Sequence, residues 1–332
     1  MRATRCGGGS SRVGEMHAVL ASFCRLLAGI GLFFAGIRLL RAGLGRAAGR
    51  RAEGALRGLT GTPLAAVLTG TVVTAVLQSS SAVTVTVVGL VDARVLDLYQ
   101  AFGVIMGANL GTCVTAQMVS FRAESLGIPV ICAGIALYVI SGVRGRRLHR
   151  DIGAALAGLG CILWGVGVTS SAMTWLAGRP WLVESLVVLG QVPALGVLAG
   201  AAFTGVIQSS SVATVMLIGL ARQGLMNLGS AVAVALGSNI GTCVTTLIAS
   251  IGAARAARKA AVLHLAFNVA GVVAVLPVFG GFVRLVEAVS PQDPGHGIAN
   301  AHTLFNLLSI LVVLPWSRRF VDVVKGAHAW TS

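Results

Sequence analysis

A polar motif, one glutamine followed by three serines, interrupts two apolar stretches of this chain. It occurs in "LQSSSAVTVTVV" (residues 77–88) and again in "IQSSSVATVMLI" (residues 207–218). Unpaired polar side chains are costly in an apolar environment, so a chain that carries them there twice has to pair them. The motif therefore constrains the fold more than any other feature of the sequence.

The two motifs belong to a longer internal repeat. The second copy lies 130 residues after the first, and this offset superimposes "GANLGTCVT" (107–115) on "GSNIGTCVT" (237–245). Starting from Thr69 and Ala199, 21 of 47 aligned positions are identical. Duplications of this kind in transporters are often inverted, with broken helices that meet near the bilayer midplane. We expect two inverted-topology repeats.

The composition indicates a membrane protein. Of 332 residues, 56% are hydrophobic and 11% are charged, and the mean hydropathy is +0.89, whereas a soluble domain has about 25% charged residues. The net charge of +15 is divided among short basic clusters between apolar segments, not gathered on one soluble face, so we predict no nucleic-acid partner. The sequence predicts an all-α, multi-pass protein of the inner (plasma) membrane. The six cysteines form no CxxC pair, and we predict neither a disulfide framework nor a metal site other than one for sodium.

The basic clusters can be used to test the topology. All of them fall on the cytoplasmic side, as the positive-inside rule requires, if residues 63–91 and 191–221 form re-entrant helical hairpins that enter from opposite faces. The basic clusters are predicted to form cytoplasmic loops at 41–57, 144–150, 255–259 and 318–325. The predicted spans are 19–40, 98–119, 126–143, 152–169, 228–250, 260–279 and 298–316.

The predicted domain organisation is one transport domain between two short tails. Residues 1–18 are polar and Gly/Ser-rich, which predicts a disordered or spurious extension, with Met16 as an alternative start. The transmembrane domain covers 19–317, with repeat 1 at about 61–143 and repeat 2 at about 190–279. Residues 318–332 are expected to form a short cytoplasmic tail.

The serines are predicted to bind an anion. A hairpin tip starts a new half-helix whose first amides lack intrahelical partners and carry partial positive charge. Amides and hydroxyls together can hold an anion without an arginine. The alternative is that the serines only pack helices together. The candidate anion ligands are Gln78, Ser79, Ser80, Ser81, Gln208, Ser209, Ser210 and Ser211.

The second motif is predicted to break its helix and to offer oxygens to a cation. Glycines permit a break, and asparagine and threonine supply neutral oxygens; plain packing of the glycines is the alternative. No predicted span has a carboxylate at its centre, which favours sodium over a carboxylate proton relay. The candidate sodium ligands are Asn109, Thr112, Thr115, Asn239, Thr242 and Thr245.

Two histidines lie in apolar segments, each followed four residues later by an asparagine. They are assigned a gating or a structural role: His264, Asn268, His302 and Asn306. A serine hydrolase within the membrane would also combine serine with histidine. Six serines in two equivalent motifs suit coordination better than attack by a single nucleophile, and we predict that the chain is not an enzyme.

The paired QSSS motifs, each followed by a GxNxGTxxT-type sequence, resemble the type II sodium/phosphate cotransporter family over residues 19–316. "AHTLFN" (301–306) and its echo "LHLAFN" (263–268) are similar to that family too. The resemblance implies a sodium-coupled carrier of inorganic phosphate, with the QSSS stretches at the phosphate and sodium sites. The chain resembles a short bacterial form without the PhoU-like C-terminal domain. Cys113 and Cys243 depart from the family pattern, which leaves one cation ligand per repeat open.

The predicted function is thus sodium-coupled phosphate symport by alternating access, in the uptake or the export direction. The open alternatives are a carrier for another oxyanion or a dicarboxylate and, more remotely, an intramembrane serine hydrolase. The expected partners are inorganic phosphate, sodium and the lipid bilayer, with a homodimer as an option. No cofactor is expected besides Na⁺ as the coupling ion.

Overall fold

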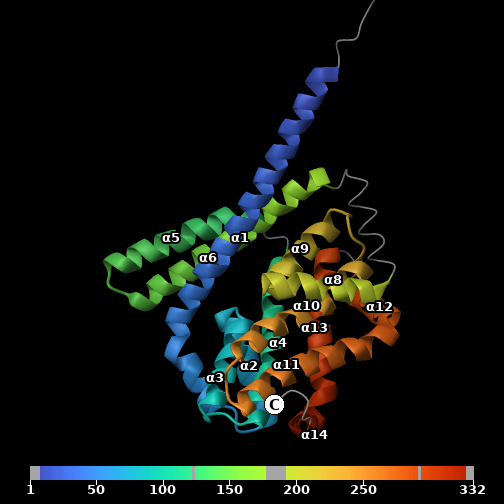
Figure 1. The fold of residues 1–332 in the computed structure, drawn as a ribbon. Coiled ribbons are helices and arrows are strands. Elements are labelled where there is room, and N and C mark those ends of the chain that lie inside the picture. Colours follow the sequence, from blue (N-terminus) through green and yellow to red (C-terminus); the bar gives the residue numbers. More distant parts are fainter. Residues whose placement is uncertain (1–7, 122–123, 177–191, 291–292, 327–332) are drawn as a thin grey trace, which may run out of the picture.

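The computed structural model describes residues 8–121, 124–176, 192–290 and 293–326, and within these ranges the chain is built from helices joined by short turns (Figure 1). The prediction of an all-α membrane protein is confirmed. Among the described residues, five helical stretches are long and apolar enough to cross a membrane: Leu20–Ala47, Leu98–Ser120, Leu228–Ala249, Arg255–Val289 and Pro294–Gly326.

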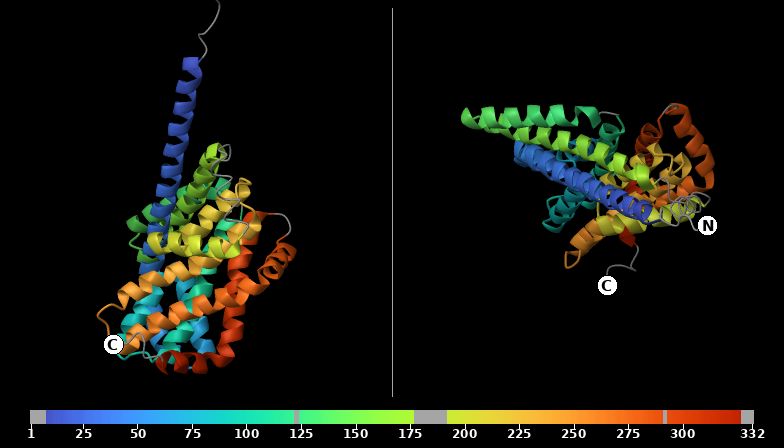
Figure 2. Two further views of the ribbon diagram at one scale, coloured as in Figure 1. Left: turned by 45° about the vertical axis from the view of Figure 1, so that its right-hand side comes forward. Right: turned by 90° about the horizontal axis from the view of Figure 1, so that it is seen from above.

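A long N-terminal helix and two others form one side of the molecule. Helix α1 (Gly8–Gly58) runs along α6 (Arg147–Leu176), and α6 also packs against α5 (Gly127–Val143), as the right view in Figure 2 shows. Small residues bring these helices together: a Cβ atom on Gly36 would lie 2.7 Å from the carbonyl oxygen of Gly158. Such stripes of small residues are a common way to pack helices in a membrane.

The predicted hairpins are present in both repeats. Hairpin 1 consists of α2 and α3 and packs on the long helix α4, and hairpin 2 consists of α8 and α9 and packs on α10. Their bounds are Pro63–Leu77, Ser80–Asp92 and Leu98–Ser120 in repeat 1, and Pro193–Ile207, Ser210–Arg222 and Leu228–Ala249 in repeat 2. The two longest hairpin helices, α2 and α8, have 15 residues each, or about 22 Å, short of the roughly 30 Å hydrocarbon core.

The expected helix breaks at Asn109 and Asn239 are wrong, because α4 and α10 run through both positions without interruption. The glycines beside them serve close packing instead. A Cβ atom on Gly107 would lie 2.0 Å from the Val67 carbonyl oxygen, and one on Gly237 would lie 1.9 Å from the matching oxygen of Val197. Glycine is required here by the approach of another backbone, not by backbone conformation.

The C-terminal third contains a second repeat, whose only sign in the sequence analysis is the similarity of "LHLAFN" (263–268) to "AHTLFN" (301–306). Two helices each end in a Leu-Pro 3₁₀ turn and continue as a shorter helix, and the prolines at 277 and 315 lie 38 residues apart, like the histidines at 264 and 302. The first arm is α11 (Arg255–Val275) with α12 (Phe279–Val289), and the second is α13 (Pro294–Val313) with α14 (Ser317–Gly326). Helix α12 was not predicted as a separate element.

Two further expectations, about the N-terminal tail and the first basic cluster, need correction. The expected disordered tail over 1–18 is helical from Gly8 onwards, and residues 1–7 lie outside the described residues. The basic segment 41–57 lies within α1, not in a loop. The short tail predicted over 318–332 contains helix α14, its residues 327–332 lie outside the described part, and its cytoplasmic location stays a prediction. Basic residues close a helix as readily as they occupy a loop, so charge alone did not place these boundaries.

Candidate functional site

Each hairpin turns at its motif glutamine. Gln78 and Gln208 end α2 and α8 in the left-handed conformation, with φ of 52° and 57°. That conformation is uncommon for a residue with a side chain and costs free energy, and it concentrates at functional sites. The same strained geometry at both glutamines indicates that the turn itself is part of the site.

The serines of both repeats line one small cavity. Its volume is about 40 Å³, enough for about three water molecules. The lining residues are Ser79, Ser80, Ser81, Gln208, Ser209, Ser210 and Ser211. The sequence-predicted anion ligands are therefore brought together from positions far apart in the chain, with the exception of Gln78.

Two helices start at this cavity. Helix α3 begins at Ser80 after the N-cap Ser79, whose hydroxyl accepts from the amide of Ala82 at 3.2 Å, and α9 begins at Ser210 after Ser209. The first amides of a helix are donors without intrahelical acceptors, and the helix dipole places partial positive charge there. The cavity thus combines hydroxyls with two electropositive helix ends.

The two glutamines behave differently. The Gln78 side chain is buried and turned back into its own repeat: its Oε1 accepts from the Thr115 hydroxyl at 2.6 Å and its Nε2 donates to the Ala75 carbonyl at 2.5 Å. Gln208 is exposed and lines the cavity. Thr245, the counterpart of Thr115, has a buried hydroxyl without a hydrogen-bond partner among the described residues.

A buried polar network lies where α4, α10, α11 and α13 meet. His264 Nε2 lies 3.2 Å from Asn109 Oδ1, and Asn109 Nδ2 donates to Asn268 Oδ1 at 2.9 Å. In the other half, His302 Nε2 lies 3.0 Å from Asn239 Oδ1. The predicted pairs of histidine and asparagine are thus joined to the predicted cation ligands of the second motif.

The two halves of this network are interlocked across the repeats. Asn268 Nδ2 donates to the thiol of Cys243 at 3.4 Å, and Asn306 Nδ2 donates to the thiol of Cys113 at 3.5 Å. The cysteines that depart from the family pattern therefore act as sulfur acceptors for asparagine. A thiol is a weak acceptor, so these contacts fix the packing of the helices more than they add hydrogen-bond strength.

Thr112 and Thr242 make local bonds only. Their hydroxyls donate to the carbonyls of Ala108 and Ser238, one turn back in the same helix, at 3.1 and 2.9 Å. Both side chains are buried. Their predicted role as sodium ligands stays a prediction.

Sequence reasoning missed two threonines in the network. The Thr246 hydroxyl lies 3.1 Å from His264 Nδ1 and 2.9 Å from the hydroxyl of Thr84 on α3. Both threonines are fully buried. Both helices carry several hydroxyl side chains, so the sequence did not single out these two threonines or indicate that Thr246 contacts a histidine.

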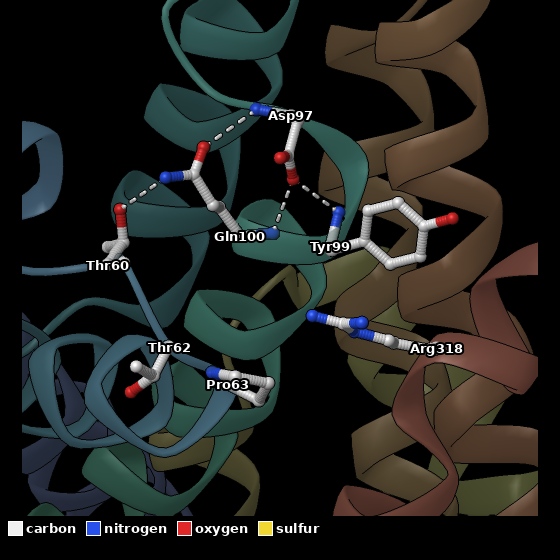
Figure 3. Close-up of a pocket in the computed structure, with 8 residues that line it drawn as sticks. Thr60, Thr62, Pro63, Asp97, Tyr99, Gln100 and Arg318 are labelled. Atoms are coloured by element: carbon white, nitrogen blue, oxygen red, sulfur yellow. Dashed lines mark hydrogen bonds between the residues drawn. The ribbon is translucent and has the colours of Figure 1, made fainter.

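A larger pocket of about 380 Å³ lies away from the serines, at the starts of α2 and α4 (Figure 3). Asp97 accepts from the amides of Tyr99 and Gln100, and the Gln100 side chain accepts from the Asp97 amide and donates to Thr60. This is a helix capping box. Arg318 reaches toward it from α14. Its polar groups serve to end and begin helices, and none of the predicted site residues lines it.

The comparisons with known proteins agree with the duplicated site. The sequence profile of the Na+/Pi-cotransporter family matches this chain twice, over residues 32–171 and 162–311. YqeW, an uncharacterized protein of Bacillus subtilis, is 34% identical over 92% of this chain and 97% of its own length.

Two other relatives are named for phosphate. YjbB of Escherichia coli, provisionally named an inorganic phosphate export protein, is 28% identical over 91% of this chain, which spans 54% of that protein. Human sodium-dependent phosphate transport protein 2C is 42% identical over 24% of this chain and 14% of its own length. No solved structure matches the chain.

Proposed function

This chain belongs to the Na+/Pi-cotransporter family, and from that premise we propose that it is a sodium-coupled carrier of inorganic phosphate in the inner membrane. The family and the relatives named for phosphate support phosphate transport, and the family is one of transporters. The observation that carries the proposal is the single cavity lined by serines from both repeats.

In this proposal phosphate binds between the two hairpin tips. The hydroxyls of Ser79–Ser81 and Ser209–Ser211 and the first amides of α3 and α9 donate to its oxygens. The positive ends of two helices offset the anion's charge, as at other helix N-termini that hold phosphate. Gln78 positions the tip of hairpin 1 through Thr115, and Gln208 faces the ligand directly.

Sodium is proposed to accompany phosphate on neutral oxygens. The candidates in the second motif are the side-chain oxygens of Asn109, Thr115, Asn239 and Thr245, together with backbone carbonyls of the tips. Sodium prefers oxygen ligands, and a bound cation would lower the cost of bringing a multiply charged anion into a low-dielectric site. Coupling follows because each ion favours the binding of the other.

Alternating access is proposed to use the inverted arrangement of the repeats. The half-span length of α2 and α8 supports hairpins that enter the membrane without crossing it. If they enter from opposite faces, the basic clusters all lie on the cytoplasmic side. The carrier would then expose the serine cavity to one side at a time.

The alternatives gain less support. The small cavity favours a compact tetrahedral anion over a dicarboxylate. A hydrolase needs a base within hydrogen-bond reach of its nucleophile, but both ring nitrogens of His264 lie beside Thr246 and Asn109, not beside a tip serine. Another tetrahedral oxyanion such as sulfate remains the second candidate, because hydroxyls and amides would bind it in the same way.

The test is labelled phosphate uptake into liposomes that hold the purified protein, with an inward Na⁺ gradient compared with an equal K⁺ gradient. The proposal expects uptake with Na⁺ only, with competition by arsenate and none by sulfate. Folded protein that moves phosphate equally well with K⁺ would refute sodium coupling. Uptake competed equally by sulfate would refute phosphate specificity.

A further inference from the structure

We propose that Thr246 is a positioning residue that fixes the tip of hairpin 1 to the polar network, and that hairpin 2, which lacks such a residue, is the gate that opens the serine cavity. The inference deepens the proposed function and rests on it for the meaning of the cavity. It starts from a difference between the repeats at two aligned positions.

In repeat 1 a chain of hydrogen bonds links the hairpin to the centre of the molecule. It runs from Thr84 on α3 to Thr246 on α10, at 2.9 Å, then to His264 on α11, at 3.1 Å, and on to Asn109 on α4, at 3.2 Å. All four side chains are buried. The second half-helix of hairpin 1 is therefore tied to three other helices close to its tip.

One assignment of protons satisfies every member of this chain. Thr84 donates to Thr246 rather than to the Ser81 carbonyl 3.2 Å away, Thr246 donates to His264 Nδ1, and the neutral ring donates from Nε2 to Asn109 Oδ1. Asn109 then donates to Asn268, which donates to the Cys243 thiol. A continuous run of donors and acceptors holds a buried network in one arrangement.

Repeat 2 lacks the residue that would complete the same chain. The position aligned with Thr246 is Ala116, which is buried and has no hydroxyl. Thr214, the counterpart of Thr84, donates to the Ser210 carbonyl in its own helix at 2.9 Å, just as Thr84 lies 3.2 Å from the Ser81 carbonyl. The difference is that Thr84 also contacts the hydroxyl of Thr246, a residue type that the aligned position in repeat 2 lacks. His302 Nδ1, the counterpart of the nitrogen that Thr246 approaches, has no hydrogen-bond partner among the described residues.

The tip of hairpin 2 is correspondingly less fixed. Gln208 is exposed where Gln78 is buried and bonded to Thr115. The buried atoms Thr245 Oγ1, Asn239 Nδ2 and Asn306 Oδ1 also lack partners within the described part of the chain, although Thr115, Asn109 and Asn268 have theirs. Unpaired buried polar atoms raise the free energy of the folded state. A movement of hairpin 2 that gives these atoms partners would therefore be favourable, whereas the corresponding atoms around hairpin 1 are already paired.

Both hairpins are attached at the end away from the cavity. Asp92 at the end of α3 accepts from the amide of Ala254 before α11, at 2.7 Å. Arg222 at the end of α9 forms a buried ion pair with Asp293 before α13, also at 2.7 Å. Hairpin 2 is therefore held at its outer end and loose at its tip, which is the arrangement of a gate that pivots.

The test is hydrogen–deuterium exchange of the whole protein in lipid nanodiscs, followed by mass spectrometry of the two tips (residues 76–84 and 206–214). We expect the tip of hairpin 2 to exchange about tenfold faster, the factor that one or two net hydrogen bonds supply. Equal exchange, or faster exchange in hairpin 1, would overturn the inference.

Matched substitutions test the residue itself. Thr246→Ala should raise exchange at the tip of hairpin 1 to the level of hairpin 2, and Thr246→Ser, which keeps the hydroxyl, should not. Ala116→Thr, or the smaller Ala116→Ser, should slow the tip of hairpin 2. Thr86→Ala is the control, because Thr86 is exposed on α3 and bonds only within its helix. Unchanged exchange in Thr246→Ala would overturn the role of Thr246.

Adding Na⁺ and phosphate separates this inference from the proposed function. Protection of the hairpin 2 tip by phosphate supports both. A faster hairpin 2 tip that responds to neither ion leaves the gate in place and counts against phosphate as the ligand. Protection of the hairpin 1 tip alone would contradict the gate while supporting phosphate binding.

Discussion

In repeat 1, the asparagine of the second motif bonds to a histidine and to another asparagine, and the motif glutamine is held by a threonine. In repeat 2, the same residue types stand at the same aligned positions, but Asn239 bonds only through its oxygen and Gln208 is exposed. The difference teaches that a duplicated motif preserves the ligands of a site while its surroundings decide how firmly each copy is held. The following substitutions test that comparison.

The largest effect is expected at the outer ends of the hairpins. Arg222→Met would remove the guanidinium that pairs with the buried carboxylate of Asp293, and breaking a buried ion pair in this way costs about 3–5 kcal/mol. Asp92→Asn, at the matching end of hairpin 1, should cost well below that, because its contact with Ala254 is exposed. The free energy of unfolding in a detergent titration measures both. Equal losses would show that the two outer ends are equally fixed.

Replacing the two asparagines of the second motif should lower the stability by different amounts, because the two substitutions leave different numbers of buried groups without a partner. Asn109→Leu would orphan His264 Nε2 and Asn268 Oδ1, whereas Asn239→Leu would orphan His302 Nε2 only. At about 1–3 kcal/mol for each buried unsatisfied group, the first variant should be the less stable by about one such contribution. The same unfolding titration compares them, and a less stable Asn239→Leu would mean that repeat 2, and not repeat 1, is the more firmly held half.

The glycines should behave alike in both repeats. Gly107→Ala and Gly237→Ala would each drive a methyl group into a backbone carbonyl, and overpacking of this kind costs about 1–3 kcal/mol. Gly89→Ala is the control, because a Cβ atom there meets nothing within 4 Å. Thermal unfolding of the three variants in detergent would measure the loss of stability at Gly107 and Gly237 against the Gly89 control. A tolerated Gly237→Ala beside a harmful Gly107→Ala would mean that α8 and α10 pack less closely than α2 and α4.

The smallest effects are expected at Thr115, which bonds to Gln78, and at its aligned counterpart Thr245. Thr115→Val would remove the hydrogen bond to Gln78 Oε1 and should cost about 1 kcal/mol, the net value of one hydrogen bond. Thr245→Val removes a buried hydroxyl that has no partner in the described residues and should be neutral or slightly stabilising. Melting temperatures of the two variants, measured side by side without ligand, distinguish them. A loss at Thr245→Val would reveal that its hydroxyl is engaged in the folded protein.

Much of this arrangement follows from the sequence, for physical reasons that differ from element to element. The hairpins could be predicted because Gln-Ser-Ser-Ser cannot continue an apolar helix cheaply. Among the described residues, five of the seven predicted spans fall in helices long and apolar enough to cross a membrane, and the spans predicted at 126–143 and 152–169 do not. The helix breaks at Asn109 and Asn239 could not be judged correctly, because Gly107 permits both a break and a close approach, and only the position of Val67 decides between them.

The site was predictable in its members but not in its connections. The offset of 130 residues matched the serines of the two repeats, yet it could not show that both sets line one cavity. The role of Thr246 was hidden because its partners, Thr84 and His264, belong to helices that the chain order does not make neighbours. Contacts between distant segments are what a single sequence leaves undetermined.

The central claim is that one phosphate is held by serines from both repeats. The most direct measurement is calorimetric binding of phosphate, with Na⁺ present, to the purified protein and to Ser80→Ala and Ser210→Ala, with Ser141→Ala on α5 as the control. Each tip variant should lose about tenfold or more in affinity, because hydrogen bonds to a charged ligand contribute about 1.5–3 kcal/mol, and the control should bind like the wild type. If either tip variant binds phosphate as well as the wild type, the shared site is contradicted.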